Sequence, residues 1–136
     1  MRNAVIRGAA LASIVNLALW VVASVAGVVP PIAETIPTVA GVAFASAGGV
    51  AAAGIVAKRF TGTGARRRWD RVAWVVLVLS IGSPIGLALG LIPVSPIDPT
   101  NALLIAFKGG IAAIYGVMHV TTFVAVQRTV AQEIQG

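Results

Sequence analysis

A row of polar side chains interrupts the last apolar stretch of this sequence, at spacings that place them on one face of a helix. At about 100° per residue, Lys108, Tyr115, His119 and Thr122 share that face with Ala112. Polar groups in hydrocarbon are costly and usually face the interior of a helix bundle. Two interpretations follow. The side chains hydrogen-bond one another and fix helix packing, or they form a site for a ligand, a proton or an ion.

His119 is the only histidine of the sequence and lies deep in this stretch. It precedes Arg128 by nine residues, which is roughly 13 Å along a helix. An imidazole at that depth cannot reach water, and unpaired ring nitrogens in hydrocarbon are costly. We therefore expect the ring to face the bundle interior and to hydrogen-bond another helix. The first candidates are Asn16 in the first apolar stretch and Ser80 or Ser83 in the third.

Lys108 stands three turns before His119 on the same face, about 16 Å away and too far for direct contact. We expect Lys108 near the outer membrane interface, where a long side chain can snorkel to water. A water-filled path between the two residues would indicate a proton or ligand route. Packing of Ala112 and Tyr115 against the first helix would favour the structural interpretation.

The distribution of ionisable residues argues against an enzyme. The sequence has one histidine, no cysteine and four acidic residues, and all four acids lie outside the apolar stretches. Histidine without a carboxylate or nucleophile nearby in sequence is weak support for acid–base catalysis. No motif for a phosphate, dinucleotide or metal site occurs. We therefore predict a non-catalytic protein without catalytic, cofactor-binding or metal-binding residues.

A basic run precedes the third apolar stretch and contains Arg66, Arg67, Arg68 and Arg71. One role for such a run is to hold a loop on the cytoplasmic side of a membrane. A second role is to bind anionic lipid headgroups, at about 1 kcal/mol per cation near the surface. The net charge of +6 is explained by these residues at helix ends, so no nucleic-acid partner is expected.

Composition and spacing predict the elements that must position these residues. Hydrophobic residues make up 58% of the 136 residues and charged residues only 10%, whereas soluble domains carry about 25% charged residues. A membrane helix needs about 20 apolar residues. The chain therefore reads as one all-α domain over residues 1–136, a four-helix transmembrane bundle. We expect the four spans at residues 8–29, 35–58, 71–92 and 99–127, with a basic loop at 58–71.

Lysine and arginine indicate the orientation, because they accumulate in short cytoplasmic loops. Nine of the ten lie before the first span, between the second and third, or after the fourth, and only Lys108 does not. This asymmetry predicts that both termini are cytoplasmic, in a multi-pass protein of the cell membrane. Trp69 and Trp74 flank the start of the third span, as expected of interfacial anchors.

Small residues form a row along the second span, at Gly41, Ala45, Gly49 and Ala53. Such spacing lets helices approach closely in lipid. We expect the row to pack inside the bundle, with self-association or a membrane partner protein as the alternative. In the third span, Pro84 removes a backbone donor and is expected to kink the helix.

Three short motifs carry a resemblance to a known group: Arg67-Arg68-Trp69, the run Ser80-Ile81-Gly82-Ser83-Pro84, and Met118-His119. With them the chain resembles a family of small, uncharacterised four-helix membrane proteins found mainly in actinobacteria. The resemblance implies the same architecture and no assigned activity. We therefore expect a structural or interaction subunit. The alternative is a small transporter or channel with its polar site around His119, although the first helix has Asn16 and lacks the acid of small multidrug transporters.

Overall fold

The computed structural model describes residues 1–95 and 98–134, and every regular element in these ranges is helical. The chain is all-α, as predicted, with four long helices. The elements in chain order are α1 (Arg2–Val25), the 3-10 turn η1 (Ile32–Glu34), α2 (Ile36–Ala57), α3 (Ala65–Ala88), the short α4 (Ala102–Ala106), α5 (Lys108–Arg128) and the 3-10 turn η2 (Ala131–Glu133).

The ends of α1 differ from the predicted span of 8–29. The helix begins at Arg2, because charged residues at a membrane surface can continue a helix that crosses the membrane. It ends at Val25 rather than at the two prolines further on. Gly27 has a φ of 71°, which glycine adopts without strain, and the Val28 amide donates to the Ala23 carbonyl at 2.8 Å. By contrast, α2 agrees with its predicted span within one residue at each end.

The third helix begins six residues before its predicted start at residue 71. Gly64, with a φ of 74°, precedes Ala65, the first residue of α3. Arg66, Arg67 and Arg68 therefore lie in the first turn of a helix, and the predicted loop at 58–71 is shorter than expected. The charged run marks only the boundary of the apolar segment, and the helix extends through it. α3 continues through Pro84 and ends at Ala88.

The predicted single helix over 99–127 consists of two pieces, α4 and α5, with Phe107 between them. Asn101 caps α4, and its side chain accepts from the Leu104 amide at 3.1 Å. The Asp98 carboxylate accepts from the side chains of Thr100 and Asn101, at 3.2 and 3.3 Å.

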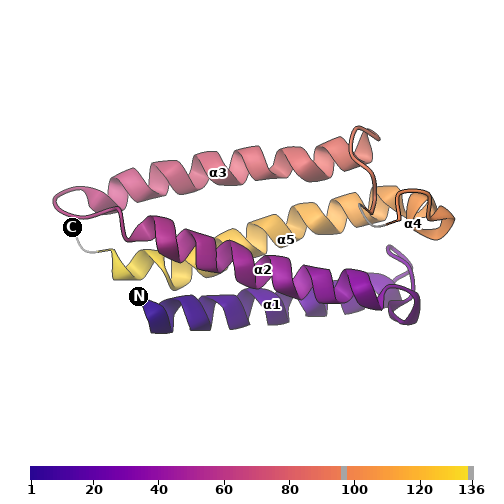
Figure 1. The fold of residues 1–136 in the computed structure, drawn as a ribbon, viewed down its shortest axis with the longest axis horizontal. Helices are drawn as coiled ribbons and strands as arrows, with labels where there is room; N and C mark the ends of the chain where they lie inside the picture. Colours follow the sequence, from indigo (N-terminus) through magenta and orange to yellow (C-terminus); the bar gives the residue numbers. More distant parts are fainter. Residues whose placement is uncertain (96–97, 135–136) are drawn as a thin grey trace.

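The four long helices do not pack equally. α1 lies against both α2 and α5, whereas α3 is attached to the rest chiefly through α5 (Figure 1). Met1, η2 and the connection between α2 and α3 share one end of the molecule. Contacts at that end include the Met1 ammonium, 2.6 Å from the Glu133 carboxylate, and Arg66, which donates to the Ala131 carbonyl at 2.8 Å. α2 and α3 therefore pack little against each other, which leaves an open face between them.

Glycines allow the closest approaches between α1 and its neighbours. A Cβ on Gly54 of α2 would lie 2.3 Å from Val5, and one on Gly8 of α1 would lie 2.4 Å from the Thr129 hydroxyl. A Cβ on Gly110 of α5 would lie 1.7 Å from the Val28 carbonyl oxygen. Close approach of this kind drives helix association where lipid removes the hydrophobic effect.

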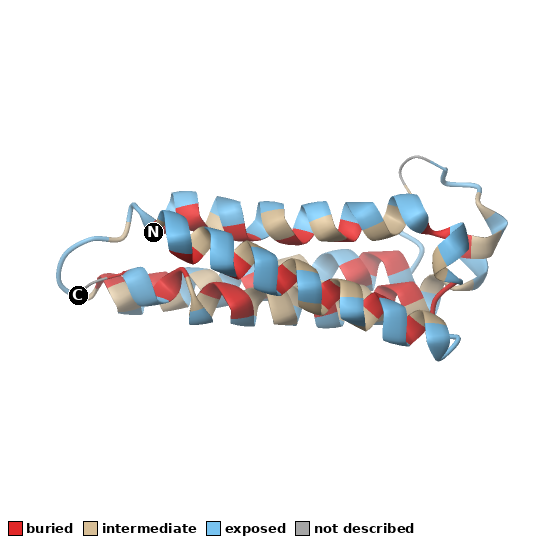
Figure 2. Cartoon of the chain, turned by 90° about the horizontal axis from the view of Figure 1, so that it is seen from below, coloured by how far each residue is buried: buried red, intermediate tan, exposed pale blue. Residues whose placement is uncertain are grey.

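The outer surface of the helices is apolar. Exposed residues cover the outside of the cartoon in Figure 2 and buried residues line the inner faces. Large side chains such as Phe44, 83% exposed, and Leu79, 71% exposed, have no cover within the chain. Within the described residues, α1, α2, α3 and the segment from Lys108 to Glu133 are each long and apolar enough to cross a membrane. This is a multi-pass membrane protein.

Candidate functional site

Asn16 is the centre of a buried hydrogen-bond network that joins three helices. Its side chain is 1% exposed. Its amide nitrogen donates to the Ser46 hydroxyl of α2 at 2.8 Å and to the Thr122 hydroxyl of α5 at 3.0 Å. The Thr121 hydroxyl donates to the amide oxygen of Asn16. A buried amide is stable in this position because both its donor and acceptor groups are satisfied.

This network agrees with the interpretation that the polar residues fix helix packing. Its members, however, differ from those expected. Thr122 and Asn16 were expected in it, whereas Ser46 and Thr121 were not. Ser46 also donates to the Val42 carbonyl at 2.7 Å, so its hydroxyl both donates and accepts. A polar residue inside an apolar span usually faces the bundle interior, and that rule applied to Ser46 would have identified it.

His119 does not make the expected bond to another helix. Its Nδ1 lies 2.7 Å from the Tyr115 carbonyl oxygen, one turn earlier in α5. A carbonyl oxygen can only accept, so Nδ1 carries the hydrogen, and in the neutral ring Nε2 is left as an acceptor. The local carbonyl is within reach without any movement of the helices, which is why it replaces Asn16 as partner. The Ser80 hydroxyl also bonds within its own helix, where it donates to the Leu77 carbonyl at 2.8 Å.

A cavity of about 950 Å³ lies between α2 and α3, with α5 as its floor. We call this cavity the α2–α3 groove. Tyr115, His119 and Thr122 line it from α5, and Ser80 and Ser83 line it from α3. Tyr115, His119 and Thr122 thus line one groove, and the structure brings His119 and Ser80 to it without a bond between them.

The small-residue row of α2 forms the opposite wall of the α2–α3 groove. A Cβ on Gly41 would have no atom within 4 Å, and one on Gly49 would meet only the Thr122 methyl at 3.6 Å. The expectation that this row packs inside the bundle is therefore wrong for Gly41, Ala45 and Gly49, which are exposed, whereas Ala53 packs against the core that contains Val50. Spacing shows that a helix could approach there, but α3 is held away by its packing on α5.

Lys108 lies outside the α2–α3 groove. Its Nζ is 3.5 Å from the position that a Cβ of Gly90 would take, just beyond the C-terminal end of α3, where the helix dipole favours a cation. Ala112 is buried with Trp20 of α1, and the rings of Trp20 and Tyr115 lie 6.0 Å apart. Ala112 and Tyr115 therefore pack against the first helix, which favours the structural interpretation.

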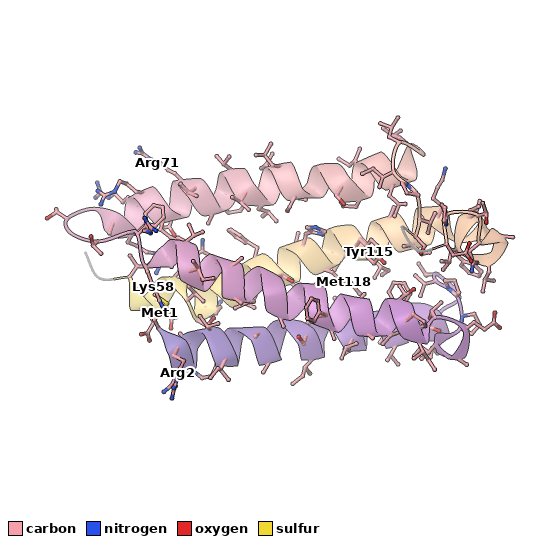
Figure 3. The ribbon with its side chains drawn as sticks, in the orientation of Figure 1. Met1, Arg2, Lys58, Arg71, Tyr115 and Met118 are labelled. Atoms are coloured by element: carbon pink, nitrogen blue, oxygen red, sulfur yellow. The ribbon has the colours of Figure 1, made fainter. Side chains whose placement is uncertain are left out.

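The predicted lipid-contacting arginines divide into two pairs. Arg66 bonds Asp70 at 3.1 Å and the Ala131 carbonyl at 2.8 Å, while Arg68 donates to two carbonyls of the α2–α3 connection. Arg67 and Arg71 are exposed and make no hydrogen bond or ion pair with any described residue. Figure 3 shows Arg71 with Arg2 and Lys58 at the end of the bundle that holds Met1.

The two tryptophans near the start of α3 also differ. Trp74 is 57% exposed and its ring lies 4.9 Å from that of Phe123, which suits an interfacial anchor. Trp69 was expected in the same role, but it is 3% exposed and packs edge-on against Phe60 at 5.5 Å. Trp74 lies on the face of α3 that meets lipid, and Trp69 lies on the face that meets the core. Their nearness in the sequence alone could not predict these different environments.

These features define an α-helical multi-pass membrane protein with a groove that opens between two of its helices. The chain belongs to DUF6069, a family of unknown function whose model matches residues 1–92. The match covers α1 to α3 and ends before α5, and it confirms the resemblance to an uncharacterised family. No curated protein and no solved structure matches the chain.

Proposed function

We propose that this chain is a non-catalytic binding protein of the cell membrane that takes a lipophilic molecule from the bilayer into the α2–α3 groove. One observation carries the proposal: a cavity of about 950 Å³ with exposed residues such as Gly41 of α2 and Val76 of α3 on its two walls. Exposure of both walls means that the groove opens sideways to lipid. Its volume falls within the range of small-molecule sites, about 300–1,000 Å³.

The composition of the lining supports a ligand rather than a packing gap. Small and aliphatic side chains line most of the groove, and polar side chains reach it from α3 and α5, from Asn16 of α1 and Ser46 of α2, and from the connecting segments at one end. A pocket that is mainly apolar with a few placed polar groups is the usual form of a ligand site. A defect in helix packing has no reason to gather Ser80, Ser83, Tyr115 and His119 around one space.

The side chains around His119 support a non-catalytic role. Nδ1 of its ring is engaged by the carbonyl of Tyr115. The carboxylates that line the groove, Glu34 and Asp98, belong to segments outside the long helices. Within the described residues, no three His, Asp or Glu side chains gather as a metal site would require. The packing of Ala112 and Tyr115 against the first helix likewise speaks against the transporter alternative.

The orientation proposed from the sequence places both termini and the α2–α3 connection in the cytoplasm. The shared end of Met1, η2 and that connection supports placing all three on one side of the membrane, and the basic residues there assign that side to the cytoplasm. A membrane-impermeant thiol reagent added to intact cells should label a Glu34→Cys variant and leave Thr63→Cys unlabelled. Equal labelling of both would contradict the orientation.

Two glycines of α2 provide a matched test of the groove. Gly41 lines it and Gly48 does not, and a Cβ on either would meet no atom within 4 Å. Gly41→Phe should fill the groove, whereas Gly48→Phe should only add a ring facing lipid. The measurement is photolabelling in lipid nanodiscs by hexadecyl methyl ether that carries a diazirine, with labelled peptides located by mass spectrometry.

The wild-type protein and Gly48→Phe should be labelled at groove residues of α2 and α5, and Gly41→Phe should lose most of that labelling. Labelling spread evenly over exposed lipid-facing residues in all three proteins would overturn the proposed function. A circular dichroism spectrum of each variant controls for folding.

A further inference from the structure

Two polar groups on the floor of the α2–α3 groove have hydrogen-bonding capacity that the chain itself does not use. His119 presents Nε2 as an acceptor, because Nδ1 donates to the Tyr115 carbonyl at 2.7 Å. The Tyr115 hydroxyl makes no hydrogen bond with any described residue, and the Tyr115 side chain lines the same cavity as His119. Both side chains thus line a space that opens to hydrocarbon.

Their spacing in the sequence places the two side chains next to each other. Tyr115 and His119 are four residues apart in α5, so their side chains are neighbours on one face of the helix. Figure 3 shows Tyr115 on the part of α5 that lies between α2 and α3 in this view. The site is deep in the membrane, since His119 is roughly 13 Å along the helix from Arg128.

We propose that the groove selects a membrane-soluble molecule with a hydroxyl group on an apolar chain, and that Tyr115 and His119 bind this hydroxyl between them. The ligand O–H donates to Nε2 of His119, and the ligand oxygen accepts from the Tyr115 hydroxyl. This inference names the ligand class for the proposed binding function and rests on it.

Other polar groups fit this pair less well. A ketone or ester oxygen would accept from Tyr115 and leave Nε2 of His119 without a donor. A carboxylate or phosphate would be an unpaired charge in hydrocarbon, which is costly. Among the described residues, neither lysine nor arginine lines the groove, so no cation offsets that charge. A hydroxyl is the simplest neutral group that both donates and accepts.

The dimensions suit a slender molecule. From Trp69 to Ser83, the groove follows α3 for about 21 Å at 1.5 Å per residue. Gly41, Ala45 and Gly49 leave room for an extended hydrocarbon chain along α2.

The test compares two probes that differ in one group. Hexadecanol and hexadecyl methyl ether, each carrying a diazirine, are added to the full chain in nanodiscs, and labelling of α5 peptides is quantified. The ether oxygen accepts but cannot donate. We expect the alcohol to label groove residues at least about fivefold more than the ether, as one added hydrogen bond in a low-dielectric site would give.

Variants of Tyr115 and His119 test the two proposed hydrogen bonds to the ligand separately. Tyr115→Phe keeps the ring beside Trp20 and removes only the hydroxyl, so it should weaken labelling by both probes. His119→Phe should abolish the preference for the alcohol, and His119→Gln, which supplies an amide oxygen as acceptor, should restore part of it. Ser13→Ala, outside the groove lining, is the control that should change neither result.

The outcomes separate the two proposals. Equal labelling of groove residues by alcohol and ether would overturn the hydroxyl selection and leave the binding groove standing. An alcohol preference that persists in His119→Phe would also overturn it, whereas the preference should persist in Tyr115→Phe, because Nε2 of His119 still accepts there. Absence of groove labelling by either probe would overturn the proposed function as well, and a dimer measured by light scattering would then identify a second copy as the occupant.

Discussion

At the residue scale, Asn16 shows how one side chain holds several helices together in a membrane. It bonds Ser46 of α2 and both Thr121 and Thr122 of α5. None of these groups can turn to water, so the network is satisfied internally or not at all. Hydrogen bonds between membrane helices contribute about 0.6–2 kcal/mol each, and several converge here on one residue.

Asn16→Ala should lower the free energy of unfolding by about 1–3 kcal/mol, since the mutation removes several partly buried bonds at once. Ser46 donates to a carbonyl of its own helix, and the Thr121 hydroxyl lies 3.0 Å from the Met118 carbonyl, to which it donates once Asn16 is removed, so the loss is limited. The measurement is unfolding of the detergent-solubilised protein by SDS, followed by tryptophan fluorescence.

Ser13→Ala is the matched control for this prediction, because Ser13 makes a single bond, to the Ala43 carbonyl at 3.1 Å. It should cost under about 1 kcal/mol. If Asn16→Ala were no more destabilising than Ser13→Ala, the central role of Asn16 would be wrong.

At the scale of the elements, glycines decide which helix faces can meet. Gly110 of α5 lies so close to Val28 that a Cβ would be 1.7 Å from a backbone oxygen and 2.8 Å from its carbon. Backbone cannot yield as a flexible side chain does. Gly109, the adjacent residue, has nothing within 4 Å of its Cβ position.

Gly110→Ala should destabilise the protein by about 1–3 kcal/mol, because α5 must move away from the segment after α1. Gly109→Ala should be neutral or stabilising by up to about 1 kcal/mol, from helix propensity alone. The same SDS titration measures both. Equal effects of the two mutations would show that the contact with Val28 does not control this packing.

At the scale of the whole molecule, charge is concentrated at the end that holds Met1 and the α2–α3 connection. Part of it is engaged inside the chain, as with Arg66 and Arg68. Arg67 and Arg71 stand one turn apart on α3, and Trp74 follows one turn further, with no described partner for either cation. This face is suited to a lipid phosphate at the membrane surface.

Replacing Arg67 and Arg71 together by Gln should reduce retained phosphatidylglycerol in native mass spectrometry, at about 1 kcal/mol per removed cation, and leave unfolding by SDS nearly unchanged. Replacing Arg66 and Arg68 by Gln should do the reverse, since those side chains hold η2 and the α2–α3 connection. Loss of lipid from the second pair only would contradict this assignment.

The sequence by itself determined the all-α architecture and the number of spans, because a bilayer demands about 20 apolar residues per crossing whatever packs beside them. It was less reliable for the ends of the helices. The basic run from Arg66 to Arg71 marks where the apolar segment stops, whereas Gly64 and Gly27, with positive φ, mark where helices begin and end.

Only the tertiary structure decided which polar and small residues meet. The row at Gly41, Ala45 and Gly49 permits close approach by a helix but does not specify one, and the attachment of α3 to α5 left that row facing a cavity. The sequence indicated that His119 faces inward, yet its partner depended on distance. The Tyr115 carbonyl lies within reach in the same helix, while Asn16 is already satisfied by Ser46, Thr121 and Thr122.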